Sequence, residues 1–247
     1  MDTKEAIENI FTINLAVKEG ERVLVFTDIG GDVEGVTGIR DVAIKVAEVG
    51  RTYCDIIYTE FPSTGCHGTE PPKELWQAAM GEAAVGELEE GGLLDRILRK
   101  TATPEDIAKA ETIIEAHCDD CVSAVVALSR YSTSHTRFRG LLAKAAGVRY
   151  ASMPNFEAVM LEGVMTADWR EIEERTVRLA EMLNGAGKVS VTTPNGTSIS
   201  FSIEGRAVKP DTGILTEPGT FGNLPAGEAF VAPVEGTAEG VLIIDWG

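Results

Sequence analysis

Glu228 is the residue of this sequence best placed for metal chemistry. It lies in the segment Asn223-Leu-Pro-Ala-Gly-Glu-Ala-Phe-Val-Ala-Pro233, between an expected turn and an expected strand, and Glu235 and Glu239 follow closely. Carboxylates on β elements are good ligands for hard or borderline divalent cations. One glutamate is not a site, however, and from spacing alone the alternative is a solvated loop residue.

A second candidate site follows the strand expected at residues 122–128. His135 ends the polar segment after this strand, and Arg137 and Arg139 come directly after it. Ligands of open α/β sheets bind at the carboxyl ends of the strands, so His135 could act in acid–base chemistry or bind an anion with the two arginines. The alternative is that His135 holds the loop at the start of a helix. A Gly-x-Ser-x-Gly motif is absent, so a serine hydrolase is poorly supported.

Two further motifs have weaker functional interpretations. The turn at 27–32 could hold an anion, but it lacks the Gly-x-Gly-x-x-Gly fingerprint and its two aspartates would repel phosphate, so a plain turn is favoured. Cys118 and Cys121 could form a redox pair or half of a zinc site. They precede a strand instead of opening a helix after one, which favours two small residues at a helix-to-strand junction.

Composition and charge exclude several classes of function. The 247 residues include 22 Lys and Arg against 39 Asp and Glu, for a formal net charge of −17. Such a chain repels phosphate backbones and anionic membranes, so we expect neither as a partner. No apolar stretch reaches the length of a membrane helix and the acidic N-terminus lacks a signal-peptide pattern, so we expect a cytoplasmic protein. The four cysteines are too few for a disulfide scaffold.

The elements that would position these residues follow an α/β pattern. A strand at 22–27, a helix at 36–49 and a strand at 53–61 predict a parallel βαβ unit. Thr103-Pro104-Glu105-Asp106 has the residues of a helix start. We expect further helices at 3–18, over most of 74–100 with a break at Gly91-Gly92, at 136–146 and at 168–183, and further strands at 122–128 and 148–153.

The pattern changes after residue 186. Residues 188–203 alternate around Pro194-Asn195-Gly196, which is a strong hairpin signal, and the remainder is rich in Gly, Pro and Thr. We therefore predict two domains. Residues 1–186 form an α/β domain with an open, mostly parallel sheet and flanking helices, and residues 187–247 form the start of a β-rich, α+β catalytic domain.

The segment around Glu228 resembles the metal-site motif of the aminopeptidase T / aminopeptidase S family of metallopeptidases. The resemblance covers most of the chain and is weakest between about residues 62 and 110. Three other segments resemble parts of that family: Ser134 to Arg149; Ala-Ser-Met-Pro154 with Met165-Thr-Ala-Asp168 downstream; and Val-Thr-Thr-Pro-Asn-Gly196-Thr197.

The resemblance implies a two-domain, dimeric enzyme that removes N-terminal residues from peptides with two divalent metal ions (Co, Zn or Mn). Glu228 would be a metal ligand, and we expect His135 and Arg139 to bind substrate. The family's other ligands lie downstream, and this sequence has no histidine after His135. The metal centre therefore cannot be completed from these residues. We expect a truncated chain, and the alternative is a natural short relative that has lost the chemistry.

Two rival interpretations stay open. Ring-cleaving dihydroxypyridine dioxygenases resemble the same superfamily and use one iron; the intact Glu228 favours the peptidase over them. The other rival is a non-catalytic module for small-molecule binding or dimerisation, made of the N-terminal domain. The missing histidines favour that module.

Overall fold

The structure, a computed structural model, describes residues 3–30 and 38–245. The chain divides into two compact units. Unit 1 comprises Met1–Trp169 and Gly213–Pro225, and unit 2 comprises Arg170–Thr212 and Ala226–Gly247. The compact units thus differ from a single boundary near residue 186, because unit 2 begins at Arg170 and residues 213–225 return to unit 1.

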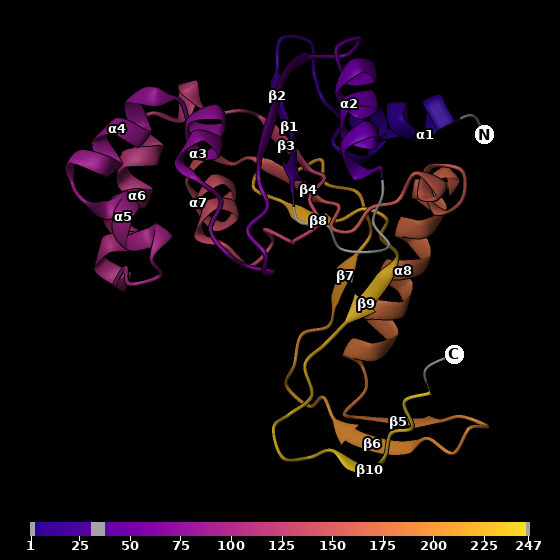
Figure 1. The fold of residues 1–247 in the computed structure, drawn as a ribbon. Helices are drawn as coiled ribbons and strands as arrows, with labels where there is room; N and C mark the ends of the chain where they lie inside the picture. Colours follow the sequence, from indigo (N-terminus) through magenta and orange to yellow (C-terminus); the bar gives the residue numbers. More distant parts are fainter. Residues whose placement is uncertain (1–2, 31–37, 246–247) are drawn as a thin grey trace. The chain divides into compact units, whose positions relative to one another are not determined.

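The sheet of unit 1 has five parallel strands in the order β2-β1-β3-β4-β8 (Figure 1). They are β1 (Arg22–Ile29), β2 (Asp55–Pro62), β3 (Ala124–Ala127), β4 (Arg149–Ser152) and β8 (Phe221–Asn223). β3 and β4 are buried along their whole length, as is typical of central strands in a parallel sheet covered on both faces. The expected α/β class is confirmed.

Helices cover both faces of this sheet (Figure 1). α2 packs against β1 and β2, whereas α7 packs against β4 and α3. The helices of unit 1 are α1 (Thr3–Asn9), which continues as a π-helical segment (Ile10–Asn14), α2 (Ile39–Gly50), α3 (Lys73–Met80), α4 (Glu82–Glu90), α5 (Leu93–Leu98), α6 (Pro104–Ala116) and α7 (Arg137–Ala146), with short 3₁₀ segments at Cys118–Asp120, Ala158–Leu161 and Val164–Thr166.

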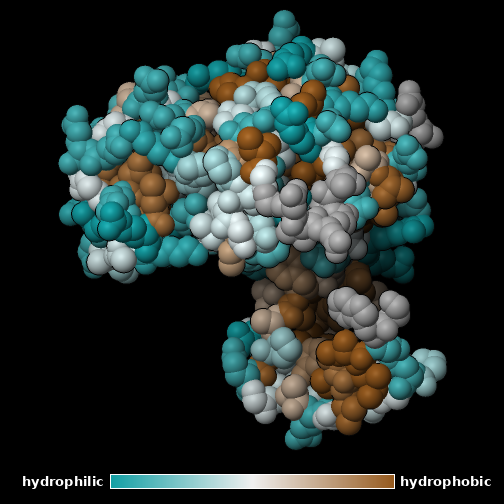
Figure 2. Space-filling view, in the orientation of Figure 1, coloured by the Kyte–Doolittle hydropathy of each residue, from teal (hydrophilic) through white to brown (hydrophobic). Residues whose placement is uncertain are grey.

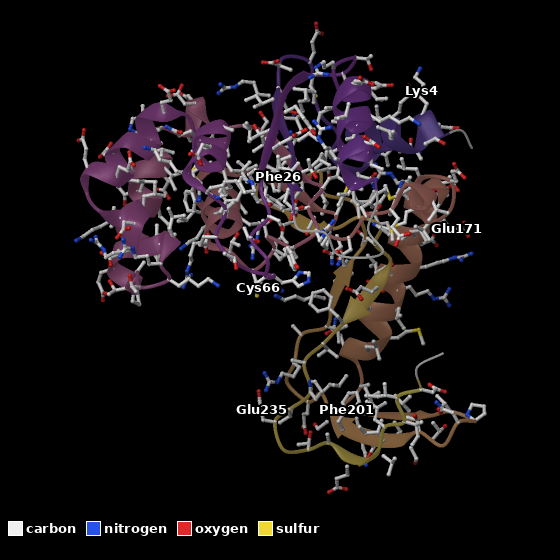
Figure 3. All side chains as sticks on the ribbon, viewed as in Figure 1. Lys4, Phe26, Cys66, Glu171, Phe201 and Glu235 are labelled. Carbon is white, nitrogen blue, oxygen red and sulfur yellow. The ribbon has the colours of Figure 1, made fainter. Side chains whose placement is uncertain are left out.

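The core of unit 1 is organised around aromatic side chains. Phe26 of β1 lies inside this unit (Figure 3), with its ring centroid 5.7 Å from that of Phe61 and 6.4 Å from that of Phe138. Trp76 contacts Phe138 edge-on at 5.4 Å. All four side chains are nearly inaccessible to solvent. These contacts fix α3 and α7 against the sheet, because edge-to-face pairs add directional attraction to area burial.

Unit 2 contains two small antiparallel sheets and most of α8 (Trp169–Asn184). β5 (Lys188–Thr192) and β6 (Ser198–Ser202) form the expected hairpin, with β10 (Glu239–Val241) on β6, while β7 (Lys209–Asp211) pairs with β9 (Glu228–Phe230). Its buried core is small, with Ala180, Ile203 and Val208 at the centre. Apolar side chains are exposed on this unit (Figure 2), among them the run from Val241 to Ile244.

Several local signals act as expected. Thr103 and Asp106 form a reciprocal capping box at the start of α6. The helical stretch after residue 73 is broken at Gly81 as well as at Gly91-Gly92. Gly81 has φ +83°, a backbone conformation that is unfavourable for residues other than glycine.

In the described part of the chain, no helix has the length and apolarity needed to cross a membrane.

Gly50, the last residue of α2, is required by close packing. A Cβ atom at this position would lie 2.5 Å from Cζ of Phe11 and 2.8 Å from Cδ1 of Ile56. Both neighbours belong to buried or partly buried elements of unit 1. Gly86, within α4, provides a contrast, because a Cβ there would meet no atom within 4 Å.

We expect Gly50→Ala to lower the free energy of unfolding by about 1–3 kcal/mol, because the added methyl group overpacks the contact with Phe11. Gly86→Ala is the matched control and should raise the stability by about 0.5–1 kcal/mol, since alanine favours a helix interior over glycine. Chemical denaturation of the two variants measures both effects. Equal effects in the two variants would contradict the packing argument.

Candidate functional site

Glu228 begins β9 in unit 2 and is exposed. It stands opposite Asp211 of β7 in the antiparallel pair. Glu235 forms an ion pair with Arg206, and Glu239 begins β10. Among residues 3–30 and 38–245, no three His, Cys, Asp or Glu side chains come together as a metal site. The described structure therefore places Glu228 beside one other carboxylate and within no cluster of metal ligands.

The carboxyl edge of the parallel sheet is tied together by Asp28. One carboxylate oxygen of Asp28 accepts a hydrogen bond from the backbone N–H of Arg130 at 2.6 Å, and the other accepts from the Ser63 hydroxyl at 2.8 Å. Asp28 thereby connects the end of β1 to the segments that follow β2 and β3. The rest of the turn considered for anion binding, Gly31 and Asp32, lies outside the described residues.

His67 belongs to the same group of loops. Its Nδ1 atom accepts a hydrogen bond from the backbone N–H of Ser132 at 2.9 Å, and its ring lies edge-on to that of Tyr131 at 5.4 Å. His67 was not a candidate from the sequence, because it lies in a loop without a motif. It holds the segment that leads into His135, whose own side chain is exposed.

Glu70 fixes the start of α7. Its two carboxylate oxygens accept hydrogen bonds from the backbone N–H groups of Arg137 at 2.6 Å and Phe138 at 3.0 Å. These are helix N-terminal donors, which have no acceptor inside the helix. Burial raises the pKa of Glu70, and the two hydrogen bonds together with the charges of Lys100 and Arg137 act against that rise. The buried carboxylate therefore depends on α7 as much as α7 depends on it.

His135 and Arg139 line one cavity of about 600 Å³ within unit 1. We call it the α7 cavity; it is bounded by α7, by α6 and by the segment that joins α5 to α6. Its charged lining residues are Glu70, Lys100, Glu111, Arg137, Arg139 and Lys144. The structure thus brings together two of the three site residues predicted from the sequence, while Glu228 belongs to unit 2.

Arg139 is held in a fixed orientation. Its Nε–H donates to the carbonyl oxygen of Ser134 at 2.7 Å, and its guanidinium carbon lies 3.9 Å from the ring centroid of Phe221. Partial burial lowers the pKa of Arg139, although an arginine keeps its charge at neutral pH. Phe221 belongs to β8, so this contact could not be seen in the sequence around Arg139.

Lys100 lies on the rim of the α7 cavity in an unfavourable backbone conformation. Its φ angle is +57°, and it follows α5 at the position where glycine usually ends a helix. The N–H groups of Lys100 and Thr101 donate to the carbonyl oxygens of Ile97 and Arg96, which completes a Schellman motif. A non-glycine residue at such a position costs about 1 kcal/mol.

The structure does not support a redox or metal-binding role for Cys118 and Cys121. All four are free thiols, and Cys118 and Cys121 lie at the two ends of a 3₁₀ turn before β3. Burial raises the pKa of Cys121 to about 11, so its thiol stays protonated at neutral pH. A protonated thiol is a poor nucleophile and a poor metal ligand.

Comparison with known proteins decides the family. The model of the family "NicX: 2,5-dihydroxypyridine 5,6-dioxygenase" matches residues 100–247, which is more than half of the chain. The chain belongs to the NicX family. No curated protein matches it.

One solved structure supports the fold. A 2,5-dihydroxypyridine dioxygenase from Pseudomonas putida KT2440 is similar at 17% identity and a TM-score of 0.60, over 96% of this chain and 57% of that one. The chain thus spans little more than half the length of that structure. Wild-type AmpT from Thermus thermophilus is also similar at 17% identity, over 96% of this chain and 63% of that one, but its TM-score of 0.42 is too low to establish a shared fold.

Membership of the NicX family corrects the peptidase prediction. The hydrolase and proteolysis assignments are wrong. The peptide substrate that went with them stays an untested prediction. The error came from the weight placed on Glu228. A single carboxylate is a ligand for iron as well as for Co, Zn or Mn, so its presence could not separate the two chemistries.

We expect Glu70→Ala to lower the free energy of unfolding by about 1–2 kcal/mol, because two N-terminal donors of α7 lose their acceptor. Glu115→Ala, an exposed change on α6, is the control and should alter stability by no more than about 0.5 kcal/mol. Urea denaturation of both variants tests this expectation. A Glu70 variant as stable as the control would show that the carboxylate does not hold α7.

Proposed function

We propose that the chain takes part in the oxidative opening of a dihydroxypyridine-type aromatic ring. The match of residues 100–247 to the NicX family carries this proposal. The fold shared with the Pseudomonas putida dioxygenase is consistent with it. A dioxygenase places both atoms of O₂ in the organic product, so the ring itself supplies the electrons and no external reductant is required.

The residues described here do not fit a complete metal centre. Non-haem iron oxygenases hold their metal with several converging side chains, such as two histidines and one carboxylate. No three suitable side chains converge in the described part of this chain, so we assign no step to a metal. The remaining ligands of such a centre have to come from outside the described residues.

We retain Glu228 as one proposed ligand of that centre. Its carboxylate is exposed and stands across the β7–β9 pair from Asp211. Like charges directly opposite each other in a sheet are unfavourable, and a bound cation would relieve the repulsion. A second copy of the chain is one source of further ligands, and the homodimer expected from the sequence stays a prediction.

The proposed function predicts substrate-dependent consumption of O₂. We expect the chain, loaded anaerobically with Fe(II), to consume O₂ when 2,5-dihydroxypyridine is added, with equal amounts of O₂ and aromatic substrate lost. An oxygen electrode and the ultraviolet absorption of the ring measure the two quantities. Glu228→Gln should reduce the rate, because the amide is a weaker metal ligand than the carboxylate.

The matched control substrate is 3-hydroxypyridine, which lacks the second hydroxyl group and should not be opened. Glu204→Gln, an exposed change elsewhere in unit 2, is the control variant. Absence of substrate-dependent O₂ uptake at every iron loading would overturn the proposal for this chain. Equal rates in the Glu228 and Glu204 variants would remove Glu228 from the proposed ligand set.

A further inference from the structure

The α7 cavity combines an apolar wall with a charged rim. Ala102 and Ile107, which are partly exposed, contribute apolar side chains, while Lys100, Arg137, Arg139 and Lys144 contribute cations. Ile97 and Leu141 also border the cavity but belong to the buried core, with 1% and 2% of their surface exposed. A volume of about 600 Å³ lies within the range of small-molecule sites. The excess of cations is notable in a chain with a net charge of −17.

The two acidic residues of the cavity are already engaged. Glu70 accepts two backbone hydrogen bonds at the start of α7. Both carboxylate oxygens of Glu111 accept from Nζ of Lys144, each at 2.7 Å. These contacts account for both negative charges and for one of the four cations.

The other three cations lack an ionic partner. Neither Lys100, Arg137 nor Arg139 forms an ion pair with any residue that the structure describes. Arg139 uses its Nε–H on Ser134 and its face on Phe221. Its two terminal amino groups, which donate no hydrogen bond to described residues, present the paired donors that suit a carboxylate.

We propose that the α7 cavity binds a small organic carboxylate with an apolar body about the size of one aromatic ring. The carboxylate would pair with Arg139, supported by Lys100 and Arg137, and the body would lie on the apolar wall formed by Ala102 and Ile107. The apolar wall favours such a ligand over inorganic phosphate, which has no apolar part to bury. This inference is independent of the proposed dioxygenase function.

Lys100 provides a second line of support. Glycine would relieve the strain of its backbone, yet the position holds a long cationic side chain on the cavity rim. Strained backbone positions cluster at functional sites, so an observed one motivates a functional hypothesis. The proposal explains why the end of α5 carries this residue.

The test uses benzoate as the probe and isothermal titration calorimetry at low ionic strength. We expect benzoate to bind, and benzamide, its neutral counterpart, to bind about tenfold or more weakly, because it lacks the charge-assisted hydrogen bonds. Inorganic phosphate and acetate should also bind more weakly than benzoate. Equal affinities for benzoate and benzamide would overturn the proposal, and tighter binding of phosphate would replace it with a phosphate site.

Variants separate the charge from the shape of the cavity. Arg139→Gln should weaken benzoate about tenfold or more, whereas Lys109→Gln, an exposed change on α6 outside the cavity, should leave the affinity unchanged. Equal losses of benzoate affinity in these two variants would indicate long-range electrostatics only and overturn the site.

Gly140→Leu tests the shape of the cavity. It should abolish benzoate binding while α7 stays folded, because Gly140 lines the cavity and a Cβ there meets no atom within 4 Å. Gly86→Leu on α4 is its control, and equal affinities in these two variants would count against the site.

Lys100→Gly distinguishes a role in ligand binding from a purely structural role of Lys100, because only a binding role predicts weaker benzoate binding. We expect the substitution to raise the Tm by about 2–4 °C, because glycine accepts the positive φ, and at the same time to weaken benzoate. Thermal unfolding and calorimetry on the same variant measure the two effects. A more stable variant with unchanged benzoate affinity would remove Lys100 from the site, and unchanged affinity in both Lys100→Gly and Arg139→Gln would overturn the proposal.

Discussion

The contact between the Glu70 carboxylate and the start of α7 is the interaction on which the α7 cavity depends. Helix N-termini carry unsatisfied donors and partial positive charge, and Glu70 supplies both acceptor and counter-charge. It fixes the loop after β2 to the helix that carries Arg137 and Arg139. The hydrogen bonds of this acid go to the backbone, so Lys100 and Arg137 act on it only through their charges and form no ion pair with it. The same buried carboxylate therefore stabilises the wall and sets its charge.

A second constraint is the return of the chain to the sheet at residues 213–225. Asn14 holds this segment. Its side-chain amide nitrogen donates to the Gly213 carbonyl oxygen at 2.9 Å, and its backbone carbonyl oxygen accepts from the Leu215 N–H at 2.7 Å. The segment then adds β8 beside β4 and places Phe221 against the guanidinium of Arg139. The Arg170–Thr212 part of unit 2 is thus inserted between two parts of unit 1 in the sequence, and the Ala226–Gly247 part follows β8. The geometry of the cavity depends on a strand that lies more than seventy residues after α7.

Sequence patterns predicted the elements whose causes are local. Apolar runs located β1 to β4, the helix-start residues Thr103-Pro104-Glu105-Asp106 located α6, and Pro194-Asn195-Gly196 located the β5–β6 hairpin. What escaped prediction depends on partners distant in the chain. β8 has three residues and no strand pattern of its own, and Glu70 differs from a solvated glutamate through its contact with α7. His135 and Arg139 could be proposed together because they share one helix start, whereas their cavity required α5 and α6 as well.

The family and the α7 cavity answer different questions about function. Membership of the NicX family concerns the reaction, and its metal ligands are not brought together in the described residues. The α7 cavity is complete within unit 1, because its cations, apolar wall and engaged acids all belong to that unit. A fold hosts many functions, so a site has to be argued from its own side chains. Here the charges of Lys100, Arg137 and Arg139 argue for an anionic ligand whichever reaction the family match indicates.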